Sequence, residues 1–394
     1  MTSNNLPLKT ITSKERLLSV LRGERADRVP VFTQIPFKLN AAGNFYPGPF
    51  HGYEDYDDWR ACDPEYHKLV NRMEKECDNF FIWRPACMKP DRIFVPAVDT
   101  TSETLTDGRV QRVETVKIDG KALQSVFIMQ PGTGHTWQTE HFCKDSGDAC
   151  ALLEMSFDPV NAGCEDYFDV LHKLGNRGVI WVTIPSPLLA VCRLFDPTTF
   201  LMLTATDPCL INRLMETATR RIAAILEVLL QEGCGPVIRF GGAEHATPPL
   251  MSERDFDWLV TQYDDPLMRL CKEHGRLVAV HCHGNIRHAL KRFVEMGFDQ
   301  TDPVEQLPDG NITLTEARTL SRNRITLTGN IQMRELHNGK PEEIKARVRQ
   351  IINEAGCERL IITTTGTPLE RIDDRLAANY HAMIDATLKY GKID

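Results

Sequence analysis

Residues 277–285 read LVAVHCHGN, a short apolar run that ends in two histidines two positions apart. Side chains on a β-strand alternate between its faces, so His281 and His283 are expected on one face and Cys282 on the other. Helix-like stretches occupy residues 255–274 and 286–296 on either side. The histidines are therefore expected at the C-terminal end of a strand, which is where β/α folds carry their chemistry.

Seven further stretches have strand character, and helices separate nearly all of them. These seven stretches are residues 28–35, 79–84, 179–185, 236–243, 299–304, 324–331 and 359–365, and residues 277–285 bring the number of strand candidates to eight. Eight β/α units on a closed parallel sheet are typical of a TIM (β/α)8 barrel. We expect one domain over residues 1–394, because no repeats or Pro/Ser-rich linkers divide the chain.

An antiparallel insertion is predicted at about residues 92–142. This segment alternates apolar and polar residues, and Asp107-Gly108 and Asp119-Gly120 are hairpin signals. Residues 36–59, in contrast, have neither strand nor helix periodicity and are rich in aromatic residues, glycine and proline. We interpret them as a long loop over a strand end.

Composition narrows the functional classes. The chain has 46 Lys and Arg against 54 Asp and Glu, a net charge of −8, without a basic stripe that would suit nucleic acid. It lacks a membrane-spanning apolar stretch and an N-terminal signal peptide, so we expect a cytoplasmic protein. The 12 cysteines include no CxxC pair and are interpreted as reduced thiols.

Polar residues collect where the strand candidates end. Among them, Glu244, His281 and His283 supply the nitrogen and oxygen donors of a zinc site, which in catalytic centres uses three protein ligands and an open position. A hydrogen-bonded polar cluster without metal is the alternative. Glu244 and Glu305 could also act as a carboxylate pair, as in barrel glycosidases. Motifs of nucleotide-binding proteins, serine hydrolases and standard metalloproteases are absent from the sequence.

Five segments together resemble the uroporphyrinogen decarboxylase-like superfamily. They are KERLLSVLRGERADRVPV (14–31), GGAEHATPPLMSERDFDWLV (241–260), VAVHCHGNIRHALKRFVEMGFDQTDPVE (278–305), RITLTGNIQ (324–332) and NYHAMIDATLKYG (379–391). The resemblance implies a TIM barrel. It also implies one of two activities, decarboxylation of a tetrapyrrole or zinc-dependent methyl transfer to or from a corrinoid.

The sequence departs from both branches at informative positions. Decarboxylases of the superfamily carry an arginine-containing RQAGRY motif, where this chain has TQIPFK at residues 33–38. Methyltransferases similar to methylcobalamin:coenzyme M methyltransferase bind zinc through H-x-C and a later cysteine. Here His281 matches the histidine, His283 stands at the cysteine position, and ITTTGTP replaces the later cysteine.

A nitrogen and oxygen site is harder than a thiolate site and suits an ether oxygen. We therefore hypothesise a corrinoid-dependent O-demethylase, in which zinc on His281, His283 and Glu244 acts as a Lewis acid. The methyl group of a methoxylated small molecule, with aromatic compounds among the candidates, would pass to cobalamin on a partner corrinoid protein, since the chain has no corrinoid motif of its own.

The same hypothesis assigns further residues. Substrate or bound water would be oriented by Asp302, Glu305, Asn330 and Gln332, while Phe37, Tyr46 and Trp83 would line the pocket. The aromatic loop at residues 36–59 is a candidate docking surface for the corrinoid protein. Two alternatives stay open, a metal-free decarboxylase and a non-catalytic binding protein that retains the barrel. The sequence also leaves a homo-oligomer open.

Overall fold

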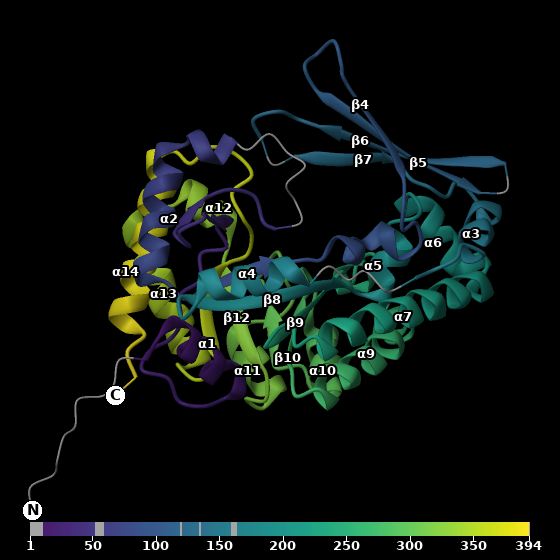
Figure 1. The fold of residues 1–394 in the computed structure, drawn as a ribbon. Coiled ribbons are helices and arrows are strands. Elements are labelled where there is room, and N and C mark those ends of the chain that lie inside the picture. Colours follow the sequence, from purple (N-terminus) through teal and green to yellow (C-terminus); the bar gives the residue numbers. More distant parts are fainter. Residues whose placement is uncertain (1–10, 52–58, 119, 134, 159–163, 394) are drawn as a thin grey trace, which may run out of the picture.

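The structure is a computed structural model that describes the chain except residues 1–10, 52–58, 119, 134, 159–163 and 394. Its centre is a curled parallel sheet surrounded by helices (Figure 1). The seven strands lie in the order β13-β12-β11-β10-β9-β8-β3. Their bounds are β3 (Asn79–Trp83), β8 (Gly178–Pro185), β9 (Val237–Gly241), β10 (Leu277–His281), β11 (Gln300–Asp302), β12 (Thr326–Ile331) and β13 (Leu360–Thr364).

The eighth predicted strand is present only as a bridging segment. Val31 forms a parallel bridge with Ile362 of β13, and its carbonyl accepts from the backbone N–H of Asp78, just before β3, at 2.8 Å. Residues 28–35 do not form a regular strand because Pro30 has no N–H to donate and Gln34 has a φ of 55°. The segment nevertheless joins β13 to β3 and completes the expected TIM-like barrel.

Helices follow the strands along most of the chain, as the sequence predicts. Their bounds are α1 (Ser13–Arg22), α2 (Pro64–Glu76), α3 (Ser146–Leu153), α4 (Glu165–Leu174), α5 (Pro187–Cys192), α6 (Pro197–Thr206), α7 (Pro208–Gln231), α8 (Glu253–Phe256), α9 (Gln262–Glu273), α10 (Arg287–Met296), α11 (Leu314–Ser321), α12 (Met333–Asn338), α13 (Pro341–Ala355) and α14 (Asp374–Tyr390). A π-helical turn, Asp257–Thr261, joins α8 to α9. Among the helices that the structure describes, none has both the length and the apolar character to cross a bilayer.

The lumen of the barrel has its own hydrophobic cluster, separate from the larger one between sheet and helices. Phe80 of β3 stacks on Trp181 of β8 with ring centroids 3.9 Å apart, and Phe32 meets both rings edge-on. Helix α1 adds Leu17 and Leu21 to this cluster at the N-terminal end of the strands. The lumen is therefore packed at that end, which leaves the C-terminal end for a cavity.

Inserted between β3 and α3 is an antiparallel sheet of four strands, which confirms the predicted insertion. It consists of β4 (Asp99–Thr104), β5 (Val110–Ile118), β6 (Lys121–Met129) and β7 (Thr136–Glu140), and it projects from the barrel body (Figure 1). Gly108 forms the predicted first turn with φ 84°. Residue 119 of the second predicted turn lies outside the described residues.

The segment predicted as an irregular loop contains a short hairpin, so that part of the prediction is wrong. Strands β1 (Phe37–Leu39) and β2 (Phe45–Pro47) pair antiparallel, and Phe37 stacks on Phe45 at 4.1 Å. Strands of three residues are too short to show alternation in the sequence. Residues 52–58, the rest of the aromatic loop, are outside the described part of the chain.

Candidate active site

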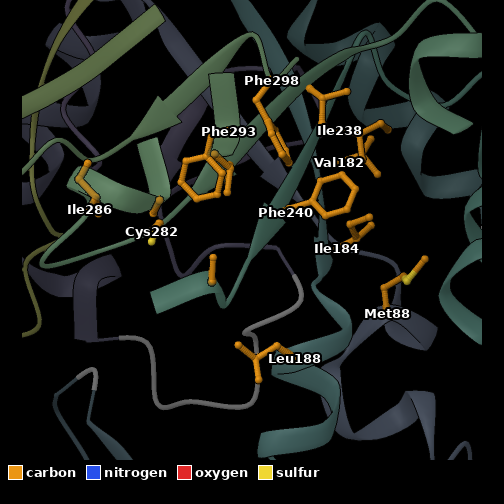
Figure 2. Packing of buried hydrophobic residues seen from close by; sticks show 14 of the residues in the cluster. Met88, Val182, Ile184, Leu188, Ile238, Phe240, Cys282, Ile286, Phe293 and Phe298 are labelled. Carbon is orange, nitrogen blue, oxygen red and sulfur yellow. The ribbon is translucent and has the colours of Figure 1, made fainter. Parts of the chain in front are cut away.

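Strand β10 directs the two histidines as the sequence predicts. His281 is its last residue, and His283 follows after one residue, with the ring centroids 4.6 Å apart and nearly perpendicular at 86°. Cys282, between them, is fully buried in the hydrophobic layer on the other side of the strand, close to Ile286 (Figure 2). The turn that follows uses Gly284 at φ 80°, a conformation that favours glycine.

Each imidazole is held by a carboxylate on its Nδ1 side. His281 Nδ1 lies 3.1 Å from Asp302 Oδ2 of the neighbouring strand β11, and His283 Nδ1 lies 3.3 Å from Glu305 Oε1. Asp302 is completely buried and also accepts from Arg239 Nη2 at 2.8 Å and Gln34 Nε2 at 3.3 Å. Such carboxylate partners orient a metal-binding histidine and fix its tautomer.

Their surroundings shift the pKa values of the two histidines in opposite directions. Burial, followed by the nearby Arg239 guanidinium, lowers the pKa of His281 below its usual value, which keeps the ring neutral at neutral pH. Burial also works against protonation of His283, but its hydrogen bond and ion pair with Glu305 outweigh burial and raise the pKa of His283. For Asp302, burial is outweighed by the contacts with His281 and Arg239, which hold its pKa well below the usual range.

A cavity of about 300 Å³ opens at this end of the barrel, and His281, His283 and Glu244 all line it. Glu244 follows β9 in the short 3-10 turn Ala243–Ala246. Its Oε2 atom is buried and has no hydrogen-bond partner in the described structure. The described residues that line the cavity are Gln34, Phe50, Ile82, Arg84, Thr183, Leu189, Arg239, Gly241, Gly242, Glu244, His281, His283, Thr365, Gly366 and Thr367.

The nitrogen and oxygen donors of this cavity are of the kind that zinc binds. With each Nδ1 directed to a carboxylate, the Nε2 atoms of the histidines are the atoms left for a ligand, and the unpartnered carboxylate oxygen of Glu244 belongs to the same cavity. As the side chains stand, no group of three or more His, Cys, Asp or Glu residues in the described ranges is arranged to hold a metal ion. Side-chain rotation would be needed to close the ligand set.

Asp302 and Glu305 occupy positions behind the histidines instead of on the cavity surface. Of the three residues predicted to line the pocket, two pack in the core and Tyr46 is exposed. Trp83 is fully buried outside the barrel lumen, because Ile82 takes the inward position on β3. Phe37 is buried against Phe45, and Tyr46 is partly exposed. The prediction that Phe37, Tyr46 and Trp83 line the pocket is therefore not met by the described cavity.

Asn330 and Gln332 are also absent from the described cavity lining. Asn330 accepts a hydrogen bond from Arg347 Nη2 of α13 at 2.9 Å, so it faces the helical layer. Gln332 precedes α12, and its Oε1 accepts from Thr365 Oγ1 at 2.8 Å. Gln332 thus reaches the site only through Thr365.

Two inward-facing residues of the cavity, Thr183 and Arg239, were not singled out from the sequence. They are register partners on β8 and β9 and alternate with outward-facing apolar residues, among them Val182 and Phe240, which Figure 2 shows in the core. An arginine at the centre of the apolar strand VIRFG was the available signal, since a charged residue is rarely buried there without a partner.

Comparison with known proteins identifies the family. The profile of the family described as "Uroporphyrinogen decarboxylase (URO-D)" matches residues 167–372, which include β8 to β13 and every histidine and carboxylate of the site. A search among curated proteins finds no match.

A solved structure shares the architecture over nearly the whole chain. A methyltransferase from Methanosarcina mazei superposes with a TM-score of 0.63 at 18% identity, covering 96% of this chain and 99% of that one. A B12-independent methionine synthase from Shewanella sp. W3-18-1 aligns with a TM-score of 0.43 at 13% identity, over 92% of this chain and 97% of that one. The family match spans slightly more than half of the chain, from residue 167 to residue 372 of 394, and the chain belongs to the uroporphyrinogen decarboxylase (URO-D) family.

Proposed function

We propose that this chain is a methyltransferase that takes the methyl group of a methoxylated small molecule and passes it to cob(I)alamin on a partner corrinoid protein. The observation that carries the proposal is the joint placement of His281, His283 and Glu244 on one cavity at the open end of the barrel. The fold shared with the Methanosarcina mazei methyltransferase is consistent with it.

His281 and His283 would hold zinc through Nε2, and Glu244 would complete the protein ligands after rotation of its carboxylate. Bound there, zinc would supply Lewis acidity to the ether oxygen of the substrate. Asp302 and Glu305 keep the imidazoles oriented from behind, and Arg239 keeps Asp302 ionised. These contacts fix the two imidazoles before substrate arrives, as preorganisation requires.

The reaction breaks one bond and forms another. The methyl carbon loses its bond to oxygen, the bonding pair stays on the oxygen, and the electron pair of Co(I) forms the new cobalt–carbon bond.

The packed lumen beneath the cavity, with Trp181 and Phe80, closes the opposite end of the barrel. The partner can therefore approach only from the side on which His283 and Glu244 lie.

The test is methyl transfer monitored by absorption spectroscopy. Zinc-loaded protein, cob(I)alamin and a panel of methoxylated compounds are combined under reducing conditions. The proposal expects conversion of cob(I)alamin to methylcob(III)alamin, and its loss in Glu244→Gln. Release of carbon dioxide from a tetrapyrrole or other carboxylate without metal would instead favour a decarboxylase. Absence of metal binding and of both reactions would favour a non-catalytic binding protein.

A further inference from the structure

Three hydrogen-bond donors form a row at one level of the barrel wall. Thr183 of β8 is the register partner of Arg239 on β9. On the other side of β8, the last register pair with β3 is Trp83 with Val182. Arg84, the next residue of the chain, therefore lies beside Thr183. Side chains at matched positions of parallel strands share a face, and Arg84, Thr183 and Arg239 all line the cavity.

Two members of this row have buried polar atoms that the protein itself does not satisfy. Thr183 is 2% exposed and Arg239 is 7% exposed. The Thr183 hydroxyl and the Arg239 Nε have no hydrogen-bond partner within the described structure. Buried polar groups are nearly always paired, so unpaired donors on a cavity wall indicate a ligand that accepts from them.

The charge of the row suits an anion. Arg239 is paired with Asp302, and Arg84 adds a second guanidinium to the same wall. Glu244 is the acidic residue of the described cavity lining, and the proposed metal would use its charge. The planar guanidinium fork matches a carboxylate better than a neutral acceptor.

The row lies deeper in the barrel than the histidines. Arg239 pairs with Ala279 on β10, whereas His281 pairs with Gly241, two residues further toward the open end. Two residues of a strand span roughly 7 Å, which is comparable to one aromatic ring with its substituents. The cavity lining around these polar groups also includes the apolar side chains of Ile82, Leu189 and Phe50.

We propose that Arg84, Thr183 and Arg239 bind the carboxylate of the substrate, which is a methoxylated aromatic acid. The inference rests on the proposed methyl transfer, because a partner-borne corrinoid can reach the methyl group only if that group points to the open end. The carboxylate then points inward to the donor row, and the ring lies between the two levels.

Equilibrium binding measured by titration calorimetry tests this assignment. The probes are para-methoxybenzoate and para-methoxybenzamide, which share shape and methoxy group and differ in charge. They are titrated into the zinc-loaded wild-type protein, Arg84→Gln and Thr183→Val, and into the control Arg269→Gln. Arg269 is a surface residue on α9, with a side chain 71% exposed. Circular dichroism confirms that each variant is folded.

We expect the wild type and Arg269→Gln to bind the benzoate at least roughly tenfold more tightly than the benzamide. Arg84→Gln should abolish this preference, and Thr183→Val should weaken benzoate binding severalfold. Equal affinity for both probes, no binding of either, or a preference that survives in both variants would overturn the inference. If the inference fails, methyl transfer from neutral methoxy compounds would still support the proposed function. Carboxylate-selective binding without methyl transfer would refute the proposed function alone.

Discussion

The imidazole of His281 and the guanidinium of Arg239 share one carboxylate. Asp302 Oδ2 lies 3.1 Å from His281 Nδ1 and 2.8 Å from Arg239 Nη2, and the whole carboxylate is buried. Since the ionised Asp302 can only accept hydrogen bonds, the proton of the neutral His281 belongs on Nδ1. Through Asp302, Arg239 in the barrel interior therefore helps to hold the ring of His281, a proposed metal ligand, in its orientation.

Replacing Asp302 should therefore affect stability and metal binding together. Asp302→Asn leaves the buried Arg239 charge without its partner, and we expect the free energy of unfolding to fall by about 3–5 kcal/mol. Zinc affinity should fall by about 10- to 100-fold, because His281 loses its orienting carboxylate. Urea unfolding and competition with a zinc-sensitive chelator measure the two effects.

The matched control for that variant is Asp265→Asn. Asp265 pairs with Arg269 on the surface of α9 at 2.8 Å, where an ion pair contributes less than about 1 kcal/mol. Asp302→Asn with the stability and zinc affinity of the control would show that the shared carboxylate does not support the site.

A second carboxylate should make stability depend on pH. Asp264 on α9 is completely buried, and neither oxygen has a hydrogen-bond partner among the described residues. Burial raises the pKa of Asp264 to about 8. The unfolded chain loses this proton near pH ~4, so between these values the folded state holds more protons and the free energy of unfolding falls as pH rises.

The Asp264→Asn variant should lack this contribution. We expect its stability advantage over the wild type to be smallest near pH 4, to grow as the pH rises, and to level off above pH 8. Denaturant unfolding across this range provides the measurement. A constant difference between the two proteins at every pH would mean that Asp264 is already ionised in the folded state.

Asp78 should control barrel closure without affecting the cavity. It accepts from Arg16 Nη1 and Arg28 Nη1, each at 2.6 Å, and from the backbone N–H of Val31 at 3.0 Å. Asp78→Asn should lower the free energy of unfolding by about 3–5 kcal/mol, because Arg28 loses its carboxylate partner and Arg16 keeps only Asp27. Zinc content of the folded fraction should stay at the wild-type level, and its loss would place Asp78 in the metal site.

Cys282 points away from the proposed zinc site, so its replacement should leave zinc binding intact. Burial raises the pKa of the Cys282 thiol well above its usual value, and the side chain is fully buried in the core. Cys282→Ala should thus retain zinc, with a modest loss of stability from the vacated volume. His283→Cys should also retain zinc, because a thiolate at that position is a good zinc ligand. Zinc loss in Cys282→Ala would show that the strand faces the other way.

The sequence predicted the barrel because its strands are apolar runs separated by amphipathic helices. Helix α1 is the clearest case, with Thr12 and Glu15 forming a capping box and Gly23 ending the helix at φ 75°. Residues 28–35 were predicted less well, because the apolar pattern was given more weight than Pro30, and because the sequence does not show the φ of 55° at Gln34. Strand pairing there depends on distant Ile362, which local periodicity cannot reveal.

The site was predicted best where strand alternation decides the outcome. His281, His283 and Glu244 were expected on one cavity, and the structure brings them there. Trp83 was misplaced because a fully buried strand shows no alternation from which to choose its inward residue. The roles of Arg239 and Asp302 depend on contact between β9 and β11, which are separated in the sheet by β10.

Zinc stoichiometry of the purified, zinc-loaded and dialysed protein, measured by elemental analysis, tests the metal site most directly. We predict close to one zinc per chain for the wild type, and loss of the metal in His281→Ala and in His283→Ala while both variants remain folded. A wild-type protein free of zinc, or zinc retained in full by both variants, would contradict the proposed function.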